Sequence, residues 1–490
     1  MPERPEKSRA HPHEATITSE ARQLMRALPR EDPDLSASTV LNRTQKVVLA
    51  VLGGCLLAGF VRDWTSTLIV INAFCLAFYL VVVTFKAYLI HLAITSRREL
   101  AFSSEELAQL EDDELPVYTI LVPLYQEADV LPRLLDGLRG LDYPKEKLDV
   151  LLLLEEDDYD TIRAARALDL PSFVRVVKTP DEPPRTKPKA CNVGLGLARG
   201  KYLVIYDAED RPEPDQLRKA VLGFQTVPPE IICIQAKLNF YNQHQNLLTR
   251  WFTTDYSVWF DLMLPGIDYL QAPIPLGGTS NHFRVDKLRE LRGWDPYNVT
   301  EDCDLGVRIA MKGYRTRILD STTWEEACSV VGYWIRQRSR WVKGYMQTYL
   351  VHLRRPLSHL HTIGLGKTVA FHLMVGGTFL CLLINPIYWA LTTAWFVFRL
   401  EDLSILFPFP LILWGLLCLF AGNFVFVYST VLATYQRGYY DLVKHCLIVP
   451  FYWFLASIAA WKGFLQLLTR PSYWEKTQHG LDLEAETETS

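Results

Sequence analysis

Apolar residues in this chain are concentrated in five long blocks, two before and three after one polar region. The blocks cover residues 47–60, 68–90, 371–398, 406–432 and 446–468. With its flanks, each block supplies the roughly 20 residues that cross the hydrocarbon core of a bilayer. This segregation predicts membrane helices around one internal polar region, and it disfavours the alternative of buried helices in a soluble protein.

Basic residues suggest how such a chain is oriented. Arginines precede the first block and follow the second, and Arg354, Arg355 and Lys367 precede the third. Cytoplasmic flanks carry the excess of Lys and Arg, so the N-terminus and the polar region are expected in the cytoplasm. Five full spans would place the C-terminal tail outside. Lys462, inside the last block, favours a segment that lies along the interface instead.

Composition excludes some classes of function. The net charge of −4 argues against a nucleic-acid-binding protein. The nine cysteines show no CxxC spacing, so neither a zinc site nor a disulfide framework is indicated. Residues 1–45 are polar, contain Pro and Arg and lack an early apolar core, which predicts a disordered tail and no cleaved signal peptide.

The polar region alternates strand-like and helix-like patterns. Strand-like runs occupy residues 117–122, 150–154, 174–177, 202–206 and 231–235, with helical patterns between them such as 128–140 and 161–168. Alternation of this kind predicts a mostly parallel sheet with crossover helices. Ligands of such sheets bind outside the carboxyl ends of the strands.

Acidic residues follow these strands where ligands would bind. The run KYLVIYDAED (201–210) is a buried-strand pattern that ends in Asp207, Glu209 and Asp210. Hard oxygen ligands there suit Mg²⁺ or Mn²⁺ holding a diphosphate. The structural alternative is a solvated acidic turn. Tyr125 and Glu127 follow the first strand, and Glu155-Glu156-Asp157-Asp158 follows the second.

Further polar motifs lie downstream. Lys189 precedes a helical run and is placed to meet a phosphate, unless it belongs to an ordinary basic loop. Gly278 belongs to a glycine pair that allows close backbone approach. Thr300-Glu301-Asp302 leads into a helix, where Thr300 could cap and the acids could favour the first turn. The run QRSRW (337–341) precedes the third block, where snorkelling arginines on an amphipathic segment are the alternative.

Taken together, these motifs resemble the processive family 2 glycosyltransferases, such as bacterial cellulose synthase and hyaluronan synthase. The resemblance covers about residues 117–347 and the membrane arrangement, and T-E-D followed by Q-x-x-R-W is its most specific part. It implies a GT-A-type (Rossmann-like) α/β cytoplasmic domain inserted between transmembrane α-helices.

The resemblance also implies roles for individual residues. The donor would meet Tyr125, Glu127, Glu156 or Asp157, Lys189, Asp207, Gln337 and Arg340. Mg²⁺ or Mn²⁺ would be held by Asp207 and Glu209. Asp302 would be the catalytic base with Glu301 beside it, and Gly278 and Trp341 would contact the acceptor. The chain departs from the family at Glu209, and its EEDD turn differs from a DDG-like sequence.

The function implied is an inverting, metal-dependent glycosyltransferase in the bacterial inner membrane. It would polymerise a sugar from a nucleotide-sugar donor, with UDP expected as the nucleotide, into a β-linked polysaccharide and export it. Accessory export or regulatory subunits would be further partners. The alternatives are a single-addition transferase acting on a lipid-linked acceptor, and a non-catalytic transporter or sensor.

The expected organisation has six parts: a disordered cytoplasmic tail (1–45), a transmembrane hairpin (46–92), the GT-A domain (115–347), interfacial helices (348–370), transmembrane or interfacial helices (371–470) and a C-terminal tail (471–490). Residues 473–480, YWEKTQHG, resemble the loop that covers the site in cellulose synthase. An amphipathic end is the alternative for that segment.

Overall fold

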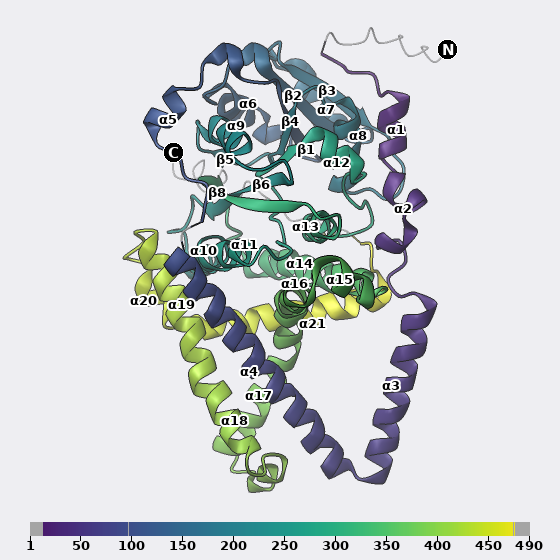
Figure 1. The fold of residues 1–490 in the computed structure, drawn as a ribbon, viewed down its shortest axis with the longest axis vertical. Helices are drawn as coiled ribbons and strands as arrows, with labels where there is room; N and C mark the ends of the chain where they lie inside the picture. The colour runs from purple at the N-terminus through teal and green to yellow at the C-terminus, as the bar shows by residue number, and fades with distance from the viewer. Residues whose placement is uncertain (1–12, 97, 474, 476–490) are drawn as a thin grey trace, which may run out of the picture.

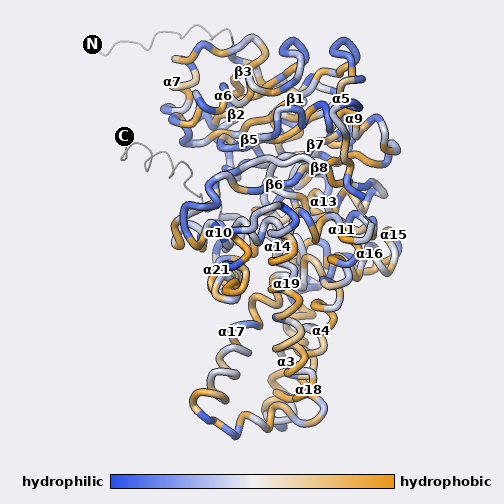
Figure 2. Tube along the Cα trace, turned by 90° about the vertical axis from the view of Figure 1, so that its left-hand side faces the viewer, coloured by the Kyte–Doolittle hydropathy of each residue, from blue (hydrophilic) through white to orange (hydrophobic). Residues whose placement is uncertain are grey.

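The computed structural model describes residues 13–96, 98–473 and 475. A mixed α/β layer lies above a group of long apolar helices (Figure 1). The tube in Figure 2 is mostly orange along the lower helices α3, α4 and α18, whereas blue and orange alternate in the upper layer. The apolar and polar parts of the sequence therefore form two separate layers of the molecule.

The upper layer is built on one eight-stranded sheet of order β3-β2-β1-β4-β7-β6-β8-β5. The strands are β1 (Tyr118–Leu124), β2 (Leu148–Glu155), β3 (Val174–Thr179), β4 (Tyr202–Ile205), β5 (Arg211–Pro212), β6 (Ile231–Phe240), β7 (Asn281–Arg284) and β8 (Arg315–Glu325).

The sheet is mixed: most of its strands run in one direction, as expected, and β5 and β7 run in the opposite one. β3, β2, β1 and β4 are parallel, and β6 is parallel to β8. β7 runs antiparallel to both β4 and β6, and β5 antiparallel to β8. β7 is only Asn281–Arg284 and carries polar side chains, so it lacks the apolar run by which the five predicted strands were recognised.

Helices cover the sheet and connect it to the lower layer. Those of the upper layer are α5 (Ser104–Ala108), α6 (Leu131–Arg139), α7 (Tyr159–Ala167), α8 (Lys187–Leu197), α9 (Gln216–Thr226), α10 (Leu247–Val258), α11 (Leu264–Tyr269), α12 (Val285–Glu290), α13 (Glu301–Met311), α14 (Val331–His352), α15 (Pro356–Ile363) and α16 (Leu365–Phe371). Two apolar clusters, one on each face of the sheet, form the main core.

Five helical stretches in the described part of the chain are long and apolar enough to cross a membrane. They are α3 (Arg43–Arg62), α4 (Trp64–Ser96), residues 365–396 ending in α17 (Gly377–Phe396), residues 411–436 with α18 (Leu411–Leu417) and α19 (Asn423–Gln436), and α21 (Pro450–Thr469), which follows the short α20 (Val443–Cys446). All five apolar blocks form helices of this kind.

The last of these helices is oriented differently from the others. In Figure 1, α21 runs crosswise beneath the sheet layer, whereas α3, α4, α17 and α18 descend from it. α21 packs along α14, the helix that carries the Q-R-S-R-W motif. Lys462 of α21 pairs with Glu475 at 2.9 Å, so its charge is matched by a carboxylate.

The N-terminal segment corrects the expectation of a disordered tail. Residues 1–12 lie outside the described residues, but residues 13–42 are ordered against the sheet layer, with α1 (Ser19–Leu24) and α2 (Ala27–Glu31) beside it (Figure 1). Ala15 donates its N–H to Val176 of β3, and Ser36 donates to the buried Asp295 at 2.9 Å. Arg354 donates to the carbonyl oxygens of Pro33, Asp34 and Ser36. These polar contacts, together with the burial of Ala21, Met25 and Leu28, order the segment.

Candidate functional site

One edge of the sheet gathers the acidic turns expected from the sequence. β1, β2 and β4 are parallel and in register, so their carboxyl ends meet. A cavity of about 920 Å³ opens at this edge. Eleven of the predicted site residues line it: Tyr125, Glu127, Asp157, Asp207, Glu209, Gly278, Glu301, Asp302, Gln337, Arg340 and Trp341.

Two predicted donor residues do not line this cavity. Lys189 is 1% exposed, and its Nζ donates to Glu155 Oε2 at 2.9 Å and to the Pro180 carbonyl oxygen at 2.8 Å. Glu156 is exposed, with its Oε2 3.5 Å from the Asp181 N–H. Of the two lysines at the start of α8, Lys187, at its first position, is the one that lines the cavity.

Lys187 lies at the centre of the polar part of the cavity. Its Nζ is 2.5 Å from Asp207 Oδ1 and 2.9 Å from the Gly278 carbonyl oxygen. Burial opposes its charge, but Asp207 and Glu301 raise the pKa of Lys187 well above its usual range. Residues two apart on a helix face different ways, and this periodicity could have separated Lys187 from Lys189.

The acids of the turn after β4 differ in their surroundings. Asp210 Oδ2 accepts hydrogen bonds from the Asp207 N–H and the Thr279 hydroxyl, so this carboxylate holds the turn together. Burial, Asp207 and Glu209 raise the pKa of Asp210 well above its usual range. Glu325, from the end of β8, joins this group, although nothing in its local sequence marks it.

This turn can hold a divalent cation only if a bound ligand supplies further oxygen atoms. The described part of the chain holds no group of three or more His, Cys, Asp or Glu side chains able to bind a metal ion. Asp207 and Glu209 line the cavity, however, and Asp210 Oδ1 is buried without a hydrogen-bond partner among the described residues. Two carboxylates completed by diphosphate oxygens are a usual Mg²⁺ donor set.

The T-E-D motif begins α13 and faces Lys187. Asp302 Oδ1 accepts from the Cys303 N–H at 2.7 Å, and a Cβ at Gly278 would lie 3.5 Å from Asp302 Oδ2. Burial raises the pKa of Asp302 to about 6. Burial and the Asp302 charge raise the pKa of Glu301 to about 8. Thr300 occupies the N-cap position but makes no side-chain capping bond.

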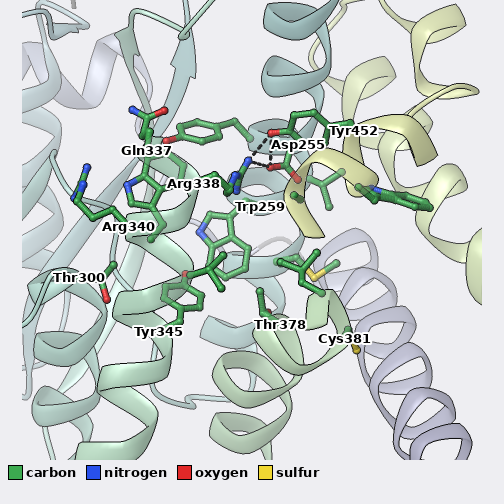
Figure 3. Close-up of a pocket in the computed structure, with 18 of the residues that line it drawn as sticks. Asp255, Trp259, Thr300, Gln337, Arg338, Arg340, Tyr345, Thr378, Cys381 and Tyr452 are labelled. Carbon is green, nitrogen blue, oxygen red and sulfur yellow. Dashed lines mark hydrogen bonds and ion pairs between the residues drawn. The ribbon is translucent and has the colours of Figure 1, made fainter. Parts of the chain in front are cut away.

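The helix α14 also contributes its motif to the wall of the cavity. Figure 3 shows Gln337, Arg338 and Arg340 projecting from it. Arg340 Nη1 lies 3.4 Å from the Val299 carbonyl oxygen. Thr300 Oγ1, Gln337 Oε1 and the Nε atom of Arg338 are buried without a partner in residues 13–96, 98–473 and 475. Orphaned polar atoms of this kind are what a polar ligand would satisfy.

One side chain of α14 joins the loop before Glu301 to the C-terminal segment. Gln347 Oε1 accepts from the Val299 N–H at 3.2 Å, and its Nε2 donates to the Pro471 carbonyl oxygen at 3.0 Å. Lys343 donates to the Tyr473 carbonyl oxygen at 2.7 Å. Trp474 and residues 476–490, which contain most of the predicted loop motif, lie outside the described residues.

The cavity continues from the sheet edge into the space between the apolar helices. Its lower wall includes Tyr79 and Lys86 of α4, Asn385 and Trp389 of α17, and Phe426 of α19. Lys86 Nζ lies 5.0 Å from the centre of the Phe426 ring. The polar turn, the T-E-D motif and the apolar helices therefore share one continuous space.

A mixed sheet with acidic turns at its ligand edge, closed by α13 and α14, defines a GT-A-like glycosyltransferase fold. The family described as "Glycosyl transferase family group 2" matches residues 202–455, more than half of the chain. The chain belongs to this family, and the family assignment made from the motifs is confirmed.

Similar proteins include several glycosyltransferases. The chain is 28% identical over 235 residues to the probable glycosyltransferase YdaM of Bacillus subtilis, covering 47% of this chain and 56% of YdaM. It is 27% identical over 266 residues to the probable glucomannan 4-beta-mannosyltransferase 7 of Oryza sativa subsp. japonica, covering 51% of this chain and 45% of that protein. The chain thus spans about half the length of the curated relatives it matches.

Among solved structures, the mannosyltransferase PcManGT from Pyrobaculum calidifontis, in complex with GDP-Man and Mn²⁺, is similar with a TM-score of 0.39 and 19% identity. The likeness covers 71% of this chain and 99% of that one.

Proposed function

We propose that this protein is a membrane-embedded inverting glycosyltransferase that extends a β-linked polysaccharide from a nucleotide-sugar donor. The observation that carries the proposal is the single cavity that connects Asp207, Lys187 and Asp302 with the space between the apolar helices. A polymerase needs its acceptor to remain bound while it grows. A continuous path leading away from the base would meet that need.

The donor would lie at the sheet edge. In this proposal Tyr125 stacks on the base, Glu127 and Asp157 bind the nucleoside, and Lys187 with Arg340 faces the diphosphate. Mg²⁺ or Mn²⁺ held by Asp207 and Glu209 would supply positive charge to the leaving diphosphate. Lys189 would act indirectly, because it fixes Glu155 and the loop that precedes Lys187.

The acceptor hydroxyl would be deprotonated by Asp302. Its oxygen attacks the anomeric carbon as the bond from that carbon to the diphosphate oxygen breaks, and the proton passes to the Asp302 carboxylate. A pKa of about 6 keeps Asp302 largely ionised at neutral pH and still basic enough for this task. One base without a covalent carboxylate implies inversion at the anomeric carbon.

The relatives named glucomannan 4-beta-mannosyltransferases support a β-linked polysaccharide as the product. Because these relatives are named mannosyltransferases, we include mannosyl donors with the UDP-sugars to be tested. We further propose that the sheet layer is cytoplasmic in a bacterial inner membrane and that α21 lies along the interface. In this arrangement the polymer would leave between α4, α17 and α19.

One observation favours a second candidate, a single-addition transferase that acts on a lipid-linked acceptor. Lys86 lines the part of the cavity between the apolar helices and has no ion-pair partner among the described residues. A cation at membrane depth is costly and usually functional. It would suit the phosphate of a lipid acceptor.

Nucleotide release by the purified protein, measured over a panel of UDP- and GDP-sugars with Mg²⁺ or Mn²⁺, tests the proposal, with Asp302→Asn as control. Release with one donor, a long product and loss of both in the variant are expected. Release with a single sugar added to a lipid would favour the second candidate. No release from any donor in the presence of acceptor would count against both. Export is tested separately, by product appearing in the lumen of inside-out vesicles.

A further inference from the structure

An ion pair forms part of the cavity wall where the sheet layer meets the apolar helices. Arg338 Nη2 of α14 donates to Asp255 Oδ2 of α10 at 2.6 Å, and the Tyr452 hydroxyl of α21 donates to the same oxygen at 3.2 Å (Figure 3). All three residues line the cavity. Three separate elements therefore converge on one carboxylate oxygen.

Aromatic rings hold the guanidinium group of Arg338 in place. Its Cζ lies 5.3 Å from the ring centre of Phe252, 5.2 Å from that of Trp334, 5.1 Å from that of Trp341 and 5.7 Å from that of Tyr452. Cation–π contacts at this distance stabilise a partly buried arginine. The orientation of the ion pair is thus fixed before any ligand binds.

Part of the ion pair remains available for hydrogen bonding. The hydrogen bonds that Asp255 accepts fall on Oδ2, and its side chain is 37% exposed. Arg338 makes its contacts through Nη2 and is 17% exposed. Within the described part of the chain, Asp255 Oδ1 and Arg338 Nη1 have no hydrogen-bond partner.

The surroundings of the pair have the chemistry of a carbohydrate subsite. Tyr256, Trp259, Trp341 and Tyr345 line the same stretch of the cavity. Figure 3 shows Trp259 and Tyr345 close to Arg338. Aromatic faces cover the apolar side of a sugar ring, and a few fixed polar groups set its orientation. Trp259 also begins a π-helical turn (Trp259–Met263), a feature common at functional sites.

We propose that Asp255 and Arg338 bind hydroxyl groups of the acceptor chain at a sugar unit beyond the one that Asp302 deprotonates. Asp255 Oδ1 accepts a hydrogen bond from one hydroxyl, and the Arg338 guanidinium donates to another. The inference rests on the proposed function, and it adds two acceptor-binding residues. Asp255 was not marked by any motif, and Arg338 occupies a variable position of Q-x-x-R-W.

The test uses the full-length protein and the variants Asp255→Asn and Arg338→Lys. Asparagine keeps the size of the side chain but weakens its acceptor strength, and lysine keeps the charge but loses the planar fork. Nucleotide release without acceptor reports donor hydrolysis, and transfer to β-linked gluco- or manno-oligosaccharides reports use of the acceptor. We expect unchanged donor hydrolysis. The acceptor KM should rise at least about tenfold, because each variant loses one charge-assisted hydrogen bond to the acceptor.

Tyr452→Phe is the matched control. It removes a hydroxyl that donates to Asp255 Oδ2 and accepts from Arg338 Nη2. It leaves the ion pair and its cavity-facing atoms Asp255 Oδ1 and Arg338 Nη1 in place, so its acceptor KM should remain near that of the wild type. If the pair served only to hold α10, α14 and α21 together, all three variants would lower the melting temperature and donor hydrolysis in parallel. That result, or an unchanged acceptor KM in Asp255→Asn, would overturn the inference.

Direct binding of the same oligosaccharides, measured by calorimetry without donor, separates this inference from the proposed function. At least about tenfold weaker binding by Asp255→Asn supports the subsite even where the wild type releases no nucleotide. Equal affinity of the wild type and the variant, or no binding by the wild type, overturns the subsite even where nucleotide release succeeds.

Discussion

Gly344 of α14 lies so close to Thr300 that a Cβ on this glycine would stand 2.3 Å from the Thr300 Oγ1 atom. No real Cβ tolerates such a contact. The helix that carries Gln337, Arg340 and Trp341 can therefore approach the T-E-D motif only because position 344 has no side chain. The relative position of the two motifs depends on this contact.

Gly344→Ala should push α14 away from Thr300 and misplace Arg340 relative to Asp302. Overpacking of this kind costs about 1–3 kcal/mol of stability, and we expect nucleotide release to fall by more than the loss of folded protein explains. Gly332→Ala is the control on the same helix, because a Cβ there meets nothing within 4 Å. Equal activity of the two variants at equal melting temperature would refute this view of the contact.

Lys187→Met and Lys189→Met should fail in different ways. Loss of Lys187 removes a cation from the proposed diphosphate site, so nucleotide release should drop by about 10²-fold or more while the protein remains folded. Loss of Lys189 leaves Glu155 unpaired in a buried place, which costs about 3–5 kcal/mol. Activity assays and thermal unfolding of both variants distinguish these results. A folded, inactive Lys189→Met together with an active Lys187→Met would reverse the assignment.

The pH dependence of kcat/KM should show an acidic limb. Asp302, the proposed base, can accept a proton only when ionised, and its pKa is raised to about 6. The rate should therefore rise with pH through about 6 and level off above it. Glu301, with a pKa raised to about 8, is protonated and neutral over this range, so Glu301→Gln should leave the acidic limb near pH 6. A profile that is flat from pH 5 to 8 would contradict Asp302 as the base.

Ser36→Ala tests the ordered N-terminal segment. The Ser36 hydroxyl donates to Asp295, a carboxylate with no solvent exposure that lies seven residues before Asp302. Removing the donor should lower stability by about 1–3 kcal/mol, measured by thermal or denaturant unfolding. Ser38→Ala, at an exposed position of the same segment, should change stability by less than about 0.5 kcal/mol. Equal stability of both variants would mean that the segment contributes little to the domain.

The sequence predicted the parts of the molecule that local patterns determine. The apolar blocks became long helices, and the strands before Tyr125, Glu155 and Asp207 became β1, β2 and β4, because burial selects continuous β-branched and leucine-rich runs. The acids at one sheet edge followed from the parallel register of those strands.

What the sequence could not reveal depends on contacts between distant residues. Glu325 enters the site only because β8 pairs with β6, and Asp255 only because α10 packs beside α14. The sequence of the N-terminal segment predicted disorder because its order comes from distant contacts, among them those with the core and with Arg354 and Asp295, more than 250 residues away. Lys189 has the sequence context of a ligand-binding lysine, but its Nζ donates a hydrogen bond to the Glu155 carboxylate.

The two ends of the Gln347 amide have a thermodynamic consequence. The oxygen contacts the loop that leads to Asp302, and the nitrogen contacts Pro471 of the C-terminal segment. Coupling free energies are reciprocal. If a ligand shifts the loop, it changes by some factor the equilibrium between the attached and detached forms of that segment. Detachment of the segment then changes the affinity for the ligand by the same factor. Limited proteolysis near Pro471, with and without nucleotide, would then report on the occupancy of the cavity.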